Sequence, residues 1–290
     1  MSNQSTLKTF LRPVTKALKP LEAPTQRFIW AFLDAVETVL GKKDSMTPPR
    51  RMINVGSHSF TRSDFHSVGQ TLLEYMTRVG GLSKDDQILD VGCGVGRMAI
   101  QLAPLLSEKG SYNGFDIIKE SIDHCTENIS SRYPDIRFHH ADIFNSNYNP
   151  DGKYISDEYR FPFEDGSFSF VILTSVFTHM LSNEVESYMK EIQRVLKPGG
   201  RCFITFFLLN AESKKLILES RSSMNFVFPI EHGMTADAVS PEVAVAFEEE
   251  YIRQKYSELG LTILDPIHYG NWCERTTDVG FQDIVMATKN

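Results

Sequence analysis

The residues most suited to holding a ligand are three glycines that interrupt an apolar run, ILDVGCGVGRMAI, at residues 88–100. The run predicts a buried strand before the glycines and an apolar helix after them. Gly92, Gly94 and Gly96 therefore form a strand-to-helix turn, where the missing Cβ lets the backbone turn sharply and approach a ligand closely. Such a turn offers free backbone N–H groups to an anionic or polar group, so it predicts a nucleotide-like cofactor. A tight loop that binds nothing is the competing interpretation.

The segment SYNGFDI, residues 111–117, predicts a second strand that ends in an acid, Asp116. An acidic side chain about twenty residues beyond a glycine turn can accept two hydrogen bonds from a ribose diol. A solvated aspartate would be the simpler interpretation of an isolated residue, but the glycine turn at the expected distance favours ribose binding. The glycine spacing is G-x-G-x-G, whereas dinucleotide-binding proteins use G-x-G-x-x-G.

Three more segments follow in order: RFHHADIF at 137–144, FPFEDGSFSFVILTSVFTH at 161–179 and LKPGGRCFITFF at 196–207. With the first two segments they resemble the motifs of the class I S-adenosylmethionine (SAM) methyltransferases that act on small molecules. The resemblance implies a doubly wound, Rossmann-like α/β fold with a seven-stranded sheet. It also implies SAM as the cofactor and S-adenosylhomocysteine as the product.

The resemblance further assigns roles to individual residues. Asp116 would bind the ribose, and Asp142 would read the adenine amino group with Ile143 flanking the ring. The other residues implied at the cofactor are Asp90, Gly92, Cys93, Gly94, Gly96, Ile117 and Thr174.

His179 is our candidate for a catalytic base, because a hydroxyl acceptor benefits from a base and histidine titrates near neutral pH. It lies just beyond the predicted fourth strand, five residues after Thr174. A capping or packing histidine is an equally weighted alternative. His232 is the second choice, and His139 and His140 are expected beside the adenine loop. No metal is expected, because no C-x-x-C pair and no paired acids after the fourth strand are present.

These residues lead us to expect an O-methyltransferase for a hydroxyl of a sugar or similar natural product. N-methylation of a small amine is the alternative within the same class, and a non-catalytic SAM-binding partner subunit is the alternative outside it. The predicted fourth strand ends in Leu-Thr-Ser and not in Asn-Pro-Pro-Tyr, which argues against methylation of nucleobase amines.

Composition sets the wider limits. The net charge of −7 argues against general affinity for nucleic acid, and 41% hydrophobic residues suffice for one large core. The four cysteines are scattered, so we expect free thiols in a reducing cytoplasm. No apolar run is long enough to cross a bilayer, and no signal-peptide pattern opens the chain.

The alternation of strand and helix patterns places one methyltransferase domain at residues 56–290, after an N-terminal extension at 1–55. Strands are expected at 87–92, 111–117, 136–140, 168–174, 200–208, 262–267 and 281–288, with the last two forming a hairpin. Helices are expected at 63–79, 96–106, 118–131, 183–195 and 244–259. Two insertions, near 145–163 and 209–243, should emerge at the carboxyl ends of the strands and bind the acceptor.

The N-terminal extension is basic. Residues 1–51 carry nine Lys and Arg against four Asp and Glu, a net of +5, which leaves −12 for the rest of the chain. One predicted helix there has Phe28, Ile29, Phe32, Val36 and Leu40 on one face. It could rest on an anionic membrane, but its mixed polar face leads us to favour a lid on the domain.

Overall fold

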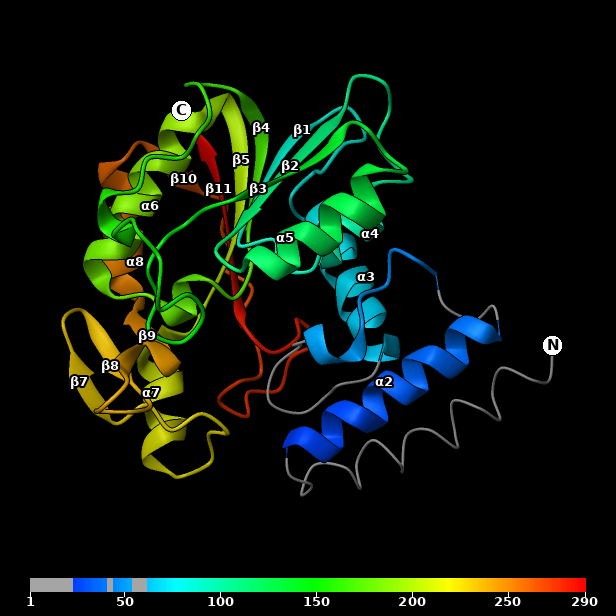
Figure 1. The fold of residues 1–290 in the computed structure, drawn as a ribbon. Coiled ribbons are helices and arrows are strands. Elements are labelled where there is room, and N and C mark those ends of the chain that lie inside the picture. Colours follow the sequence, from blue (N-terminus) through cyan, green and yellow to red (C-terminus); the bar gives the residue numbers. More distant parts are fainter. Residues whose placement is uncertain (1–22, 41–43, 54–61) are drawn as a thin grey trace.

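The computed structural model describes residues 23–40, 44–53 and 62–290, and a seven-stranded sheet forms its centre (Figure 1). In space the strands follow the order β10-β11-β5-β4-β1-β2-β3. All pairs from β5 to β3 are parallel, and β11 runs antiparallel to both β5 and β10. The doubly wound fold with a C-terminal hairpin is therefore confirmed. The strands are β1 Gln87–Val91, β2 Ser111–Asp116, β3 Ile136–His140, β4 Phe168–Leu173, β5 Leu196–Phe206, β10 Leu261–Ile263 and β11 Asp283–Lys289.

Helices cover both faces of this sheet, which is why its central parallel strands β1 and β4 are largely apolar and buried. Alternate residues of β1 point to opposite faces: Ile88 packs with Phe65 and Met98, whereas Leu89 packs with the group that contains Tyr188. Figure 1 shows the two helical layers on either side of the sheet. One layer holds α3 Arg62–Arg78, α4 Arg97–Leu102 and α5 Lys119–Cys125, and the other holds α6 Ser182–Val195 and α8 Glu249–Glu258.

Two predicted helices need correction. The helix expected at 244–259 begins at Glu249, because Val245–Glu248 form a strand, β9. Apolar residues at 245 and 247 fit a strand as well as a helix, and pairing with other strands decides between them. The helix expected at 118–131 changes at Thr126 into a π-helical turn that ends at Ser130.

Residues 208–248, which we call the cap, form a second structure beside the main sheet. Its four-stranded sheet has the order β6-β9-β8-β7. A separate hydrophobic cluster holds it together and includes Phe207, Phe226, Ala246 and Trp272. The sequence predicted only a long insertion here. The further elements of the cap are β6 Leu208–Leu209, α7 Ala211–Leu218, β7 Phe228–Ile230, β8 Gly233–Thr235 and the 3₁₀ turn η5 Pro241–Val243.

The N-terminal helix α2, Ala23–Val39, contacts the domain through charged side chains. Asp34 lies 2.5 Å from a nitrogen of Arg50 and 2.8 Å from one of Arg62, and Glu37 pairs with the same two arginines. The predicted apolar stripe points elsewhere, because Phe32, at 61% exposure, and Leu40, at 56%, are open to solvent. The stripe also includes Phe28, whose side chain lies outside the described residues. No helix in the described part of the chain is long and apolar enough to cross a membrane.

Candidate functional site

A cavity of about 1040 Å³ lies at the carboxyl ends of the parallel strands, where open α/β sheets bind their ligands. The ends of β1, β2, β4 and β5 and the start of β11 all contribute to it. Most of the residues predicted at the site line this cavity: Asp90, Gly92, Cys93, Gly94, Asp116, Ile117, Ile143, Thr174 and His179. Gly96 and Asp142 do not line it.

The three glycines of the turn have different roles, although all have positive φ angles. A Cβ on Gly92 would lie 2.3 Å from Val176, and one on Gly96 would lie 2.6 Å from Ile129, so the packing of the protein itself requires both glycines. A Cβ on Gly94 would meet nothing within 4 Å. The backbone at Gly94 therefore faces open space in the cavity, where a ligand can approach it closely.

Asp116, at the end of β2, is tied directly to this turn. Its two carboxylate oxygens accept hydrogen bonds from the backbone N–H of Gly94 at 2.8 Å and of Ile118 at 2.9 Å. Burial raises the pKa of this carboxyl, and the two backbone bonds oppose that rise. Since a carboxylate can accept about four hydrogen bonds, Asp116 keeps acceptor capacity for a diol.

Asp90 and Arg97 bring two incompletely satisfied groups to the same cavity. One oxygen of the buried Asp90 carboxylate accepts a bond from the Tyr112 hydroxyl at 2.6 Å, and the other has no partner. Burial raises the pKa of Asp90 to about 7. The Arg97 guanidinium has no hydrogen bond or ion pair with any described residue, and burial lowers its pKa. Asp90 and Arg97 also attract each other electrostatically. The free Asp90 oxygen and the guanidinium without a hydrogen bond suit the two charges of an amino-acid group.

We did not predict Arg97 from the sequence. The feature that could have identified Arg97 is its position directly after the third glycine, where the first turn of the following helix borders the ligand site. Cys93, predicted at the cofactor, lines the cavity as a protonated thiol, because burial raises its pKa well above the usual value. All four cysteines are free and buried.

His179 lies in the 3₁₀ turn η4, Phe177–His179, which follows β4. Its Nδ1 is 3.0 Å from the backbone carbonyl oxygen of Glu242. Because a carbonyl can only accept, Nδ1 carries the proton, and the lone pair of the neutral ring is on Nε2. Burial lowers the pKa of His179, which favours this neutral form. The ring of Tyr148 meets it edge-on, with 6.1 Å between the centroids.

Ser175, directly after Thr174, belongs to a polar group at the floor of the cavity. Its N–H donates to the Thr205 hydroxyl at 2.9 Å. The hydroxyls of Ser175 and Thr205 both donate to the side-chain oxygen of Gln282, at 2.9 and 2.7 Å. These three residues come from the ends of β4 and β5 and from just before β11. Because they bond to one another, most of their polar groups already have partners.

Two residues of α6, Glu184 and Tyr188, also line the cavity and were missed. Glu184 accepts hydrogen bonds from the Leu181 N–H, at 2.7 Å, and from the Ser156 hydroxyl. Burial raises the pKa of Glu184 and that of Tyr188. Their spacing of four residues on a correctly predicted helix was the signal that could have found them.

Other candidates lie away from the cavity. The Asp142 carboxylate is 3.0 Å from the Lys153 ammonium, whose hydrogen bond lowers the pKa of Asp142. Its predicted contact with adenine stays a prediction. His232 stacks on Tyr251 with 4.1 Å between the ring centroids, and His139 lies near Asn113. Neither histidine lines the cavity. No cluster of metal ligands occurs in the described residues.

Comparison with known proteins gives one family-level match. A family model described as "Methyltransferase domain" matches residues 82–244. The chain is 31% identical to an arsenite methyltransferase of Aquipseudomonas alcaligenes over 120 residues, which are 41% of this chain and 32% of that protein. Two further curated relatives are covered over 57% and 63% of their lengths. The chain thus spans less than two thirds of the curated relatives it matches.

Solved structures support the fold. A Pyrococcus horikoshii protein superposes with a TM-score of 0.54 at 19% identity, over 82% of this chain and 95% of the other. Magnesium protoporphyrin IX methyltransferase of Synechocystis, with bound S-adenosylhomocysteine, superposes with a TM-score of 0.52 at 17% identity, over 83% and 92%. At these identities the likeness concerns the fold alone.

Proposed function

This chain belongs to the methyltransferase domain family through residues 82–244, and from this premise we propose that it transfers the methyl group of SAM to a hydroxyl of a small organic molecule. The relatives named above act on acceptors as unlike as arsenite and magnesium protoporphyrin IX. The acceptor must therefore be argued from this cavity and not from the relatives.

The residues present fit SAM. The open space at Gly94 and the free acceptor capacity of Asp116 suit an adenosine with its ribose diol, and Ile117 and Ile143 offer apolar contact for the base. At the other end of the cofactor, the unpaired Asp90 oxygen suits an α-ammonium and Arg97 suits an α-carboxylate. Bound SAM supplies a methyl group on a sulfonium, and a nucleophile can attack the methyl carbon in line with the carbon–sulfur bond.

The remaining work of the protein is to place the acceptor and remove its proton. SAM held by Asp90, Arg97 and Asp116 would supply the methyl group to the acceptor oxygen, and the electron pair of its carbon–sulfur bond would stay on the sulfur of the S-adenosylhomocysteine product. The hydroxyl proton passes to Nε2 of His179, and the bond from Nδ1 to the Glu242 carbonyl holds the ring in the basic tautomer. The hydrogen bond that fixes this tautomer of a histidine in the cavity is the observation that carries the O-methylation proposal.

N-methylation is the second candidate, because Glu184 and Tyr188 place a carboxyl group and an aromatic ring at the cavity. An amine that arrives neutral needs no base. A non-catalytic SAM-binding subunit is the third candidate. It would bind SAM but transfer no methyl group to any acceptor.

We test these alternatives with His179→Ala. Calorimetry measures SAM binding, and mass spectrometry follows transfer of a deuterated methyl group to alcohols, phenols, glycosides and amines. We expect turnover of a hydroxyl acceptor to fall about a hundredfold or more with the SAM Kd unchanged. The matched control is His139→Ala, which alters a histidine outside the cavity. Equal turnover in the two variants would exclude His179 as the base, and absence of SAM binding by the native protein would overturn the whole proposal.

A further inference from the structure

One group of residues that line the cavity is apolar and comes from segments other than the glycine turn. Five residues form it, and we call them the cap wall: Phe207, Met224, Val243, Ala244 and Phe281. They come from the end of β5, from the cap and from the segment before β11. Among the described residues, the acidic and basic side chains that line the cavity belong to other segments: Arg51, Asp90, Arg97, Asp116 and Glu184.

Packing behind the cap wall holds its aromatic side chains in place. The ring centroid of Phe207 lies 5.2 Å from that of Phe226, 5.4 Å from that of Trp272 and 5.8 Å from that of Phe281. Phe226 and Trp272 are fully buried. Phe207, Met224 and Ala244 therefore belong to a packed hydrophobic cluster, and Phe281 packs on it through its ring contact with Phe207.

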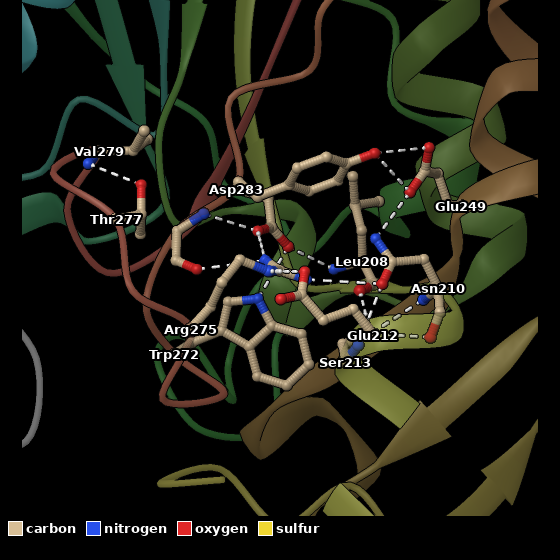
Figure 2. A network of polar contacts seen from close by, with 12 residues as sticks. Leu208, Asn210, Glu212, Ser213, Glu249, Trp272, Arg275, Thr277, Val279 and Asp283 are labelled. Carbon is tan, nitrogen blue, oxygen red and sulfur yellow. Dashed lines mark hydrogen bonds and ion pairs between the residues drawn. The ribbon is translucent and has the colours of Figure 1, made fainter. Parts of the chain in front are cut away.

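A buried carboxylate, Asp283, lies at the centre of a polar network behind these rings, and Figure 2 shows its bonds to Leu208, Trp272 and Arg275. It accepts hydrogen bonds from the N–H of Leu208 at 2.7 Å, the N–H of Gly270 at 2.8 Å and the indole of Trp272 at 2.8 Å. Arg275 adds a charged partner at 3.2 Å. Asp283 thus joins the first residue of β11 to the residue that follows Phe207, which fixes the backbone beside this wall residue.

The wall nevertheless leaves apolar surface uncovered. Phe281 is 49% exposed and Val243 is 47% exposed, and both line the cavity. Covering such surface with an apolar ligand removes it from water and stabilises the complex. The nearby polar group of Ser175, Thr205 and Gln282 is already bonded within itself. This side of the cavity is therefore better suited to bind an apolar ring than a polyol.

We propose that the methyl acceptor is an uncharged phenol or alicyclic alcohol, whose ring system lies on the cap wall while its hydroxyl meets His179. The inference rests on the proposed function and names its substrate class. His179 and the wall are joined through the segment 242–244, because Glu242 holds the histidine while Val243 and Ala244 form part of the wall. A sugar would place several hydroxyls against surface that cannot bond to them.

The test uses the full-length protein saturated with S-adenosylhomocysteine, with 2-naphthol and methyl glucoside as calorimetric probes. We expect 2-naphthol to bind at least about tenfold more tightly, because only its ring covers the wall. With SAM in place of S-adenosylhomocysteine, the deuterated methyl group should appear on the naphthol oxygen. Tighter binding of methyl glucoside, or no binding of 2-naphthol, would overturn the inference.

Two variants that add the same charge, one on the cap wall and one outside the cavity, give a matched comparison. Val243→Glu should weaken 2-naphthol binding by about tenfold or more, since the ring would then desolvate a carboxylate. Val239→Glu places the same charge four residues away on a side chain that is 93% exposed and outside the cavity, and it should change nothing. Equal effects of the two variants would contradict the proposal.

The outcome also separates this inference from the proposed function. Methyl transfer to a sugar oxygen that depends on His179 would keep O-methylation and reject the acceptor class. Transfer confined to the nitrogen of arylamines would reject O-methylation and the alcohol acceptor together. Loss of SAM binding in Val243→Glu would contradict the assignment of the wall to the acceptor.

Discussion

The two ends of the cavity are built in different ways. At the glycine turn, short-range hydrogen bonds position the groups: Asp116 accepts from Gly94, only 22 residues away. At the cap wall, contacts join remote parts of the chain: the ring of Phe207 lies 5.8 Å from that of Phe281 in the segment before β11. The first end presents backbone and charge, and the second presents apolar rings. Residues of the cap wall can change without disturbing the glycine turn. The cap-wall end can therefore suit a variable acceptor, while the glycine-turn end suits a shared cofactor.

Each end contains a buried carboxylate whose removal tests the comparison, Asp116 at the glycine turn and Asp283 beside the cap wall. Asp283→Ala would leave the N–H groups of Leu208 and Gly270 and the Trp272 indole without their acceptor in the interior. We expect the free energy of unfolding to fall by about 3–5 kcal/mol. Urea denaturation measures this loss.

The matched control is Asp265→Ala, which removes a carboxylate that is 60% exposed beside Arg253 and should cost little. In the folded Asp283→Ala protein, 2-naphthol binding should weaken while the SAM Kd stays constant. A SAM Kd that worsens as much as 2-naphthol binding would mean that the two ends are not independent.

Asp116→Ala makes the opposite change. If two ribose hydrogen bonds are lost from a buried site, SAM binding should weaken by about 2–4 kcal/mol, measured by calorimetry. 2-Naphthol binding should stay within twofold of that of the native protein. Asp123→Ala, which removes an exposed acid beside Lys119, serves as the control. An unchanged SAM Kd in Asp116→Ala would reduce Asp116 to a structural residue of the turn.

The fold was more predictable than the cap, for a physical reason. The central parallel strands are buried on both faces, so they appear as apolar runs that end at glycine or polar residues. The cap strands have two to four residues each, and β6 pairs Leu208 with Phe247 across the sheet. A strand that short carries no reliable period, and its partner decides its conformation.

The same distinction holds within the site. Asp90, Gly94 and Asp116 lie in local motifs, so the sequence could place them together at the cavity. The contact of His179 with the Glu242 carbonyl spans 63 residues and depends on where the cap folds back. Arg97 stood inside the first motif, but only the structure shows that its guanidinium has no hydrogen bond with a described residue and that Asp90 is its charged neighbour.

The smallest expected effect concerns pH at the cofactor end. The pKa of Asp90 is about 7, raised by burial, so the carboxyl is protonated at pH 5.5 and mostly ionised at pH 7.5. The ionised form attracts an α-ammonium more strongly than the neutral form does, so the SAM Kd should decrease as pH rises, by roughly three- to tenfold over this window. Calorimetry at several pH values measures this trend.

Two controls isolate Asp90 in that experiment. In Asp90→Asn the dependence should flatten, because the neutral amide keeps the shape of the side chain without its charge. 5′-Methylthioadenosine lacks the amino-acid group, so its Kd should be constant with pH in the native protein. If 5′-methylthioadenosine follows the same pH dependence as SAM, the titrating group acts on the adenosine and not on the ammonium. Asp90 would then support the turn through Tyr112, and the amino-acid group would depend on Arg97 alone.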